Sequence, residues 1–166
     1  MTKTNYLSFY QHLVSNHKDI AFDRIPNTDF TQALTWAIEQ ADKAIDTICM
    51  QKSAPSFQNT IVALEQTGRE VDAISSLFFN LFHADTNPVL QSQVASISSL
   101  LSTHQNGILL NDVLFSRVLS VYEDTSLSLN DEDKRLLEQT YKGFASNGAM
   151  LSSTNKAKLR HINSAL

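Results

Sequence analysis

Residues 56–90, SFQNTIVALEQTGREVDAISSLFFNLFHADTNPVL, carry the clearest helical pattern in the chain. Their apolar side chains recur every three or four positions, the spacing that gathers them on one face of a helix. Ser56 is a suitable N-cap, and Gly68 stands where a helix usually ends, because glycine adopts the left-handed conformation at little cost. The stretch therefore predicts two amphipathic helices joined at Gly68 and a third that begins at Asn87-Pro88.

The second of these helices, expected over residues 69–84, has the most apolar face. We expect Phe78, Leu81 and Phe82 to point inward. A helix cap contributes about 1 kcal/mol, whereas a fully buried Leu or Phe contributes roughly 1.5–3 kcal/mol. Packing of this face therefore outweighs capping in deciding the structure.

The same spacing continues on both sides of the stretch. Upstream, a helix is expected over residues 29–51, ended by Pro55, and a shorter stripe lies at residues 6–13. Downstream, one helix should end at Asn106-Gly107 and another should run from residue 111 or 112 to 122. A further helix should begin after Asn130 and end at Asn147-Gly148. The last, from residue 152 or 153, carries no stop signal at residue 166, so we expect it to be truncated.

These patterns predict an all-α, multi-helix, bundle-like domain of about six or seven helices. At 166 residues the chain is long enough for one such domain. Its single cysteine, Cys49, excludes an internal disulfide and suits a reducing compartment. The net charge of −4, with charges of both signs interspersed, disfavours a nucleic-acid surface. No apolar run is long enough for a membrane span, so we expect a cytoplasmic protein with no membrane partner.

No motif for catalysis is present. No histidine lies in a His-Glu-x-x-His motif, and no glutamate is followed three positions later by a histidine. The five histidines are therefore interpreted as surface or partly buried residues; they are His12, His17, His83, His104 and His161. Cys49 is interpreted as a small core residue, and Trp36 as a half-buried residue at the edge of the core. The chain by itself is predicted to hold no zinc and to catalyse nothing.

Several blocks, in order, resemble a known family. They are PSFQNTIVALEQTG, LFFNLFHADTNPVLQ and ILLNDVLFSRVLSVYE, followed by the text from LNDEDKRLLEQ to the end. The blocks resemble the N-terminal region of the thimet-oligopeptidase family of zinc metallopeptidases, and most strongly its bacterial peptidyl-dipeptidase (dipeptidyl carboxypeptidase) branch. The resemblance covers residues 21–166, interpreted as one helical N-terminal domain. Residues 1–20 match poorly and are expected to hold at most a short helix.

The resemblance implies a piece of a longer, almost wholly helical enzyme whose two halves enclose a channel for short peptides. In that family a His-Glu-x-x-His helix and a later glutamate hold the zinc, and no position of this chain matches them. Ten positions match the blocks, and they are assigned structural roles in capping, packing and turns, not contacts with substrate. They are Phe57, Asn59, Thr60, Leu64, Glu65, Gly68, Asn111, Leu114, Phe115 and Arg117.

The leading hypothesis is therefore a non-catalytic N-terminal domain that forms part of the channel wall of a zinc oligopeptidase. Its implied partners are the catalytic half of the parent enzyme, where the zinc belongs, and short peptides. The alternative is a free-standing helical interaction module that has lost the catalytic half. A third reading is a generic helical bundle with a coincidental likeness. Without its catalytic half, the domain is expected to leave apolar surface exposed and to self-associate.

Overall fold

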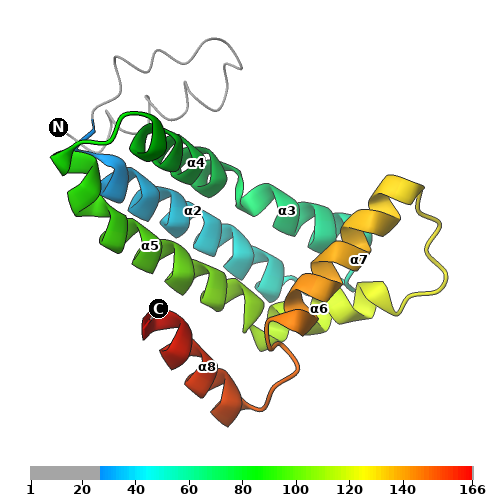
Figure 1. The fold of residues 1–166 in the computed structure, drawn as a ribbon. Helices are drawn as coiled ribbons and strands as arrows, with labels where there is room; N and C mark the ends of the chain where they lie inside the picture. The colour runs from blue at the N-terminus through cyan, green and yellow to red at the C-terminus, as the bar shows by residue number, and fades with distance from the viewer. Residues whose placement is uncertain (1–26, 166) are drawn as a thin grey trace. The chain divides into compact units, whose positions relative to one another are not determined.

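The structure, a computed structural model, describes residues 27–165, and side chains as far as residue 163 (Figure 1). Every regular element in this range is helical, which confirms the all-α prediction. The short helix predicted at residues 6–13, and the whole of segment 1–20, lie outside the described residues. In the described part, no helix is both long and apolar enough to cross a membrane.

The helices follow one another with short connections. They are α2 (Phe30–Met50), the π-helix η2 (Phe57–Val62), α3 (Ala63–Thr67), α4 (Arg69–Ala84), α5 (Pro88–Leu109), α6 (Asp112–Tyr122), α7 (Asp131–Ser146) and α8 (Ser153–Ala165). They assemble as two compact units. The first holds the described residues up to Ala41 together with Gly68–Leu100, and the second holds Asp42–Thr67 together with Leu101–Leu166. Helices α2 and α5 each contribute residues to both units.

In the first unit, α2 packs against α4 through aromatic side chains. The rings of Phe30 and Phe78 meet edge to face, with centroids 5.3 Å apart, and both residues are fully buried. Phe82 stacks on Phe78 at 6.2 Å but is only half-buried. On the α5 side, Gln93 accepts hydrogen bonds from the backbone and the hydroxyl of Thr31, both at 3.2 Å. The prediction that Phe78 is a core residue is confirmed.

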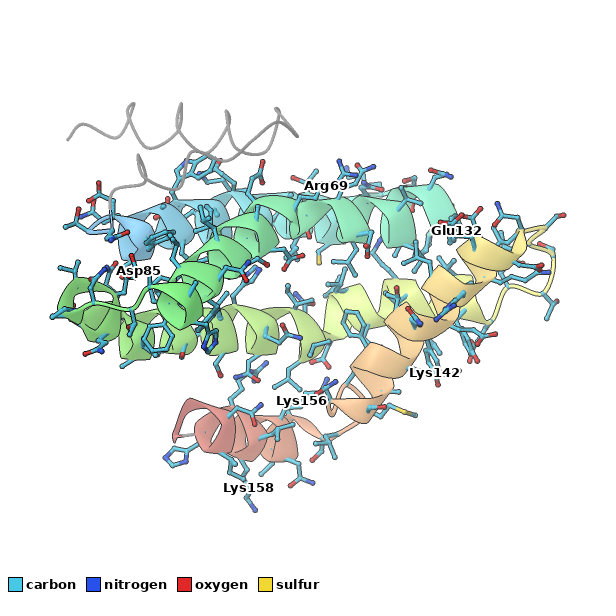
Figure 2. All side chains as sticks on the ribbon, turned by 45° about the horizontal axis from the view of Figure 1, so that its top comes forward. Arg69, Asp85, Glu132, Lys142, Lys156 and Lys158 are labelled. Carbon is cyan, nitrogen blue, oxygen red and sulfur yellow. The ribbon has the colours of Figure 1, made fainter. Side chains whose placement is uncertain are left out.

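The second unit has its own apolar core, to which α2, η2, α6 and α7 all contribute. Its buried members are Ile45, Ile48, Phe57, Ile61, Leu114, Val118, Val121, Leu137, Phe144 and Ala149. Helices α6 and α7 lie against each other over this core. The opposite face of α7 is polar: Glu132 and Lys142 are exposed (Figure 2), and Lys142 pairs with Glu138 one turn away at 3.2 Å.

The predicted helix end at Gly68 is correct in position but wrong in conformation. Gly68 has φ −84° and ψ −9°, which is right-handed, and it serves as the N-cap residue of α4. The backbone N–H of Asp72 bonds to its carbonyl at 2.9 Å. The preceding helix, α3, ends at Thr67 without a left-handed residue.

The predicted break at Asn106-Gly107 is also wrong, because α5 continues to Leu109. A glycine inside a helix costs only about 1 kcal/mol relative to alanine. Ile108 and Leu109, expected in a bridge, instead form the last turn of α5 and pack against the core of the second unit. Their burial exceeds the cost of the glycine, so the helix ends only where Asn111 begins α6.

Two large apolar side chains of the second unit remain at its surface. Tyr122 is 40 % exposed and Ile162 is 56 % exposed. Tyr122 lies at the last residue of α6, where it stacks on Tyr141 with centroids 3.9 Å apart instead of entering the core. Ile162 belongs to α8, whose buried side chain is that of Lys156.

Candidate functional site

Arg117, on α6, carries a buried polar side chain of the second unit that makes five hydrogen bonds, and it is only 7 % exposed. Its Nη1 donates to the carbonyl oxygens of Gln51, at 3.3 Å, and Ser53, at 3.4 Å. Its Nη2 donates to the side chains of Gln51 (3.4 Å), Asn59 (3.0 Å) and Thr60 (3.3 Å). One guanidinium therefore ties α6 to the loop after α2 and to the start of η2.

Asn59 is the second residue that organises this loop. Its Oδ1 accepts from the backbone N–H of Ser56 at 2.9 Å, and the Ser56 hydroxyl accepts from the backbone N–H of Asn59 at 3.2 Å. This reciprocal pair is a capping box at the start of η2. The Nδ2 of Asn59 also donates to the Ala54 carbonyl at 2.9 Å. The hydrogen bonds of Asn59 thus hold the loop in place, and those of Arg117 join it to α6.

The arginine is not equipped for acid–base chemistry. A guanidinium remains charged at any ordinary pH and has no acceptor, and its hydrogen-bond partners are carbonyl, amide and hydroxyl oxygens. Its Nε is buried without a hydrogen-bond partner in the structure. The nearby Cys49 is not an activated nucleophile either. Burial, and secondarily the Asp46 carboxylate, raises the pKa of its thiol, against the opposing effects of Arg117 and Asn111.

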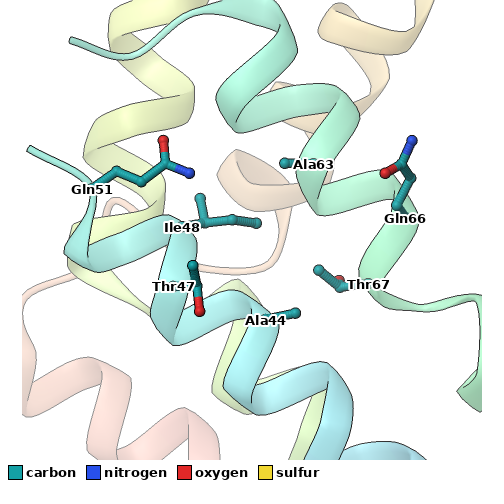
Figure 3. Close-up of a pocket in the computed structure, with 7 residues that line it drawn as sticks. All are labelled: Ala44, Thr47, Ile48, Gln51, Ala63, Gln66 and Thr67. Carbon is teal, nitrogen blue, oxygen red and sulfur yellow. The ribbon is translucent and has the colours of Figure 1, made fainter. Parts of the chain in front are cut away.

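A shallow pocket of about 370 Å³ opens beside this loop, between α2 and α3 of the second unit (Figure 3). Its lining residues are Ala44, Thr47, Ile48, Gln51, Ala63, Gln66 and Thr67. The two threonine hydroxyls already donate to helix carbonyls, at 2.8 Å each. The lining contains no titratable group, so the pocket can offer apolar contact and amide hydrogen bonds but no acid, base or nucleophile.

Three of the ten positions singled out from the sequence meet in space, although they are distant in the chain. Asn59 and Thr60 come into contact with Arg117 across 58 and 57 positions. Asn111 acts separately: it is the N-cap of α6, and its Oδ1 accepts from the backbone N–H of Leu114 at 3.0 Å.

The other positions do not join this group. Phe57 and Leu114 are buried in the core of the second unit, and Leu64 and Phe115 pack against it while partly exposed. Glu65 is exposed. Gly68, in the first unit, precedes α4. The structure therefore places most of these residues in a cap, in packing or in one polar cluster, and none of them lines the pocket between α2 and α3.

Two residues in polar contacts were missed by the sequence reasoning. Gln51 is bonded twice to Arg117, through its backbone and its side chain, and nothing in its local pattern indicates this. Lys156 is 2 % exposed. It lies three positions before Leu159 and hence on the same side of the last helix. This spacing was the signal from which its burial could have been predicted.

The described residues do not fit a zinc site. No group of three or more His, Cys, Asp or Glu side chains in that part of the chain could hold a metal ion. His104 and Asp42 form a pair, in which Nδ1 of His104 lies 2.9 Å from Oδ1 of Asp42. Two ligands do not make up the three protein ligands of a catalytic zinc centre.

Comparison with known proteins connects this helical scaffold to peptidases. The chain is 36 % identical over 143 residues to the dipeptidyl carboxypeptidase of Salmonella typhimurium strain LT2. It is 37 % identical over the same length to the dipeptidyl carboxypeptidase of Escherichia coli strain K12. Each match covers 86 % of this chain and 21 % of the relative. No family model matches the chain.

By class, then, the chain is a helical segment related to peptidases. More specifically, over most of its length it is related to the dipeptidyl carboxypeptidases, which confirms the predicted resemblance to the peptidyl-dipeptidase branch. The chain spans about a fifth of the length of these relatives.

Proposed function

We propose that this chain is the non-catalytic, N-terminal helical domain of a zinc-dependent peptidyl-dipeptidase. In the parent enzyme it would form part of the wall of a channel that admits short peptides. The observation that carries the proposal is the extent of the match, which takes in 86 % of this chain but only 21 % of the relatives. A segment of that size leaves ample room for a catalytic part elsewhere.

The polar cluster around Arg117 supports a scaffold role. Its bonds run from a guanidinium on α6 to two chain segments, the loop after α2 and the start of η2, an arrangement that rigidifies a loop. The pocket beside it is lined by uncharged side chains. In this proposal the zinc and the residues that hold it belong to the catalytic half of the parent, which is this domain's partner, and short peptides are the parent's substrates.

The reading frame beyond residue 166 is the first test. We expect it to continue and to encode a His-Glu-x-x-His motif. A stop directly after that codon would contradict the proposal and would favour the alternative, a free-standing interaction module that has lost the catalytic half.

The wall role needs a functional test in a complete enzyme. In the E. coli dipeptidyl carboxypeptidase, the matching segment would be replaced by this chain or deleted, and kcat/KM would be measured for peptides of increasing length. We expect the replacement to keep both the zinc-dependent activity and the length limit, and the deletion to lose one or both. A deletion form with unchanged kcat/KM and an unchanged length limit would contradict the wall role.

A further inference from the structure

Helix α8 is attached to the second unit in an unusual way. Among its described side chains, up to residue 163, Lys156 is the one that is fully buried, at 2 % exposure. Leu159 is half-buried and Ile162 is 56 % exposed. Helix α4, by contrast, buries four apolar side chains. Apolar burial, the usual force that docks a helix, is therefore weak for α8.

The buried lysine has one charged partner. Its ammonium donates to Oδ1 of Asp112, at the start of α6. The two ends of this ion pair differ greatly in environment, since the Lys156 side chain is 2 % exposed and that of Asp112 is 79 % exposed. Figure 2 shows Lys156 and Lys158 leaving α8 on opposite sides, and Lys158 is exposed.

Three further hydrogen bonds join α8 to α5 and to Leu110, the residue after it. Arg160 donates through Nη2 to the Leu110 carbonyl at 3.3 Å. Asn163 donates through Nδ2 to the Asn106 side chain at 2.7 Å, and its own carbonyl accepts from the Ser102 hydroxyl at 3.1 Å. Each of these bonds exchanges with water when the helix detaches, so its net contribution is modest.

The asymmetry of the ion pair decides which partner matters. An ammonium that stays buried after losing its counter-charge is strongly destabilising. A carboxylate that is mostly exposed is hydrated whether or not the lysine is present. Loss of the Asp112 charge should therefore loosen α8, whereas replacement of Lys156 by an apolar side chain of similar size should not.

We propose that α8 is a conditionally docked helix, held on the second unit by the Lys156–Asp112 ion pair acting as a charge latch. Screening or neutralising the pair favours the detached state. Detachment would uncover Leu110, which is 2 % exposed in the docked state. It would also separate Leu159 from Gly148. The Cδ2 atom of Leu159 lies 2.7 Å from the position that a Cβ on Gly148 would occupy.

Amide hydrogen exchange followed by mass spectrometry tests the latch, because it measures the opening of α8 separately from that of α6 and α7. In the wild type, raising the salt concentration from about 50 mM to about 500 mM should speed α8 exchange. Asp112→Asn keeps the shape and a hydrogen-bond acceptor but removes the charge, and should speed α8 exchange by at least about tenfold at low salt. Protection of α7 should stay unchanged in both cases.

Two further variants separate a latch from general destabilisation. Lys156→Met should leave α8 at least as protected as in the wild type and should abolish its salt dependence. Lys158→Met, the matched control on the exposed side, should change neither. The proposal is overturned if α8 exchange is insensitive to salt in the wild type, or if Lys156→Met opens α8 as much as Asp112→Asn does. If Asp112→Asn also lowers the protection of α7, the salt dependence of α8 exchange in Lys156→Met, compared with that in the wild type, still tests the proposal.

Discussion

At the residue scale, Arg117 is a buried charge that joins α6 to other parts of the second unit. Its guanidinium is bonded to the loop after α2 and to the first turn of η2. A buried hydrogen-bonding group whose partner is removed loses far more than the net value of the bond. Arg117 therefore contributes to the stability of the domain and not to acid–base chemistry.

Replacing this arginine should unfold the domain more easily. We expect Arg117→Ala to lower the free energy of unfolding by at least about 2 kcal/mol, because several carbonyl and amide oxygens lose a charged donor. Arg135→Ala is the matched control, since Arg135 is exposed on α7 and should change stability by less than about 0.5 kcal/mol. Urea titration measures both. Equal, small effects for the two variants would show that the cluster contributes nothing.

The aromatic contact of the first unit gives a second residue-level prediction. Phe78 is fully buried against Phe30, Phe79 and Phe82. Phe78→Ala should therefore cost roughly 3–5 kcal/mol of unfolding free energy. That is a large share of a typical total of about 5–15 kcal/mol. A loss below about 1 kcal/mol in a denaturant titration would contradict the core position.

Burial of Phe78 could be predicted from the sequence, but the Arg117 cluster could not. Phe78 follows from helical spacing, which is a local property. The contact of Arg117 with Asn59 joins residues 58 positions apart, and no local pattern encodes it. The resemblance marked both residues as structural, without showing that they meet. The partner of Lys156 was out of reach for the same reason.

At the element scale, the helices themselves were predictable and their ends less so. Caps such as Asn111 and Asn130 lie where the sequence places them. The error at Gly107 arises because an isolated glycine permits a helix end but does not impose one. At Gly68 the end was placed correctly, and only its conformation, which is right-handed, was wrong. The π-helical geometry of η2 has no counterpart in the spacing of apolar residues, which is equally compatible with an α-helix.

The end of α7 allows a test with two glycines of opposite behaviour. Gly148 has φ +93°, and a Cβ there would lie 2.7 Å from Leu159 and 2.9 Å from Leu151. Gly148→Ala should therefore destabilise the chain by about 1–3 kcal/mol. Gly143 is inside α7 and a Cβ there meets nothing within 4 Å. Gly143→Ala should stabilise it by about 0.5–1 kcal/mol.

Thermal unfolding of the two glycine variants beside the wild type reads out both signs. We expect the melting temperature to fall for Gly148→Ala and to rise for Gly143→Ala. A rise for both would mean that residue 148 does not need the left-handed conformation.

At the scale of the whole molecule, apolar side chains remain on the surface of the described part. Those at least 40 % exposed are Met50, Val89, Val113, Tyr122, Met150, Leu151 and Ile162. If the chain lacks its catalytic half, such surface should promote self-association. Sedimentation velocity over a range of protein concentrations should show species larger than the monomer. A monomer throughout that range would argue against an uncovered interface.

The relationship to the peptidyl-dipeptidases could be predicted from the sequence, whereas the role of this chain stays a proposal. The order of sequence blocks led to the peptidyl-dipeptidases, and the matches of 36–37 % identity agree with it. The boundaries of the proposed domain and the structural roles of its ten motif positions stay predictions. Sequence could not reveal the division into two compact units, because it depends on which distant segments pack together.

We propose that this chain is a non-catalytic part of a zinc peptidase. The most direct measurement incubates the purified chain with added zinc and a short peptide and follows dipeptide release, with the E. coli dipeptidyl carboxypeptidase assayed in parallel. The account predicts no release by this chain, with or without a chelator. Release of dipeptides by this chain that a chelator abolishes would contradict the claim.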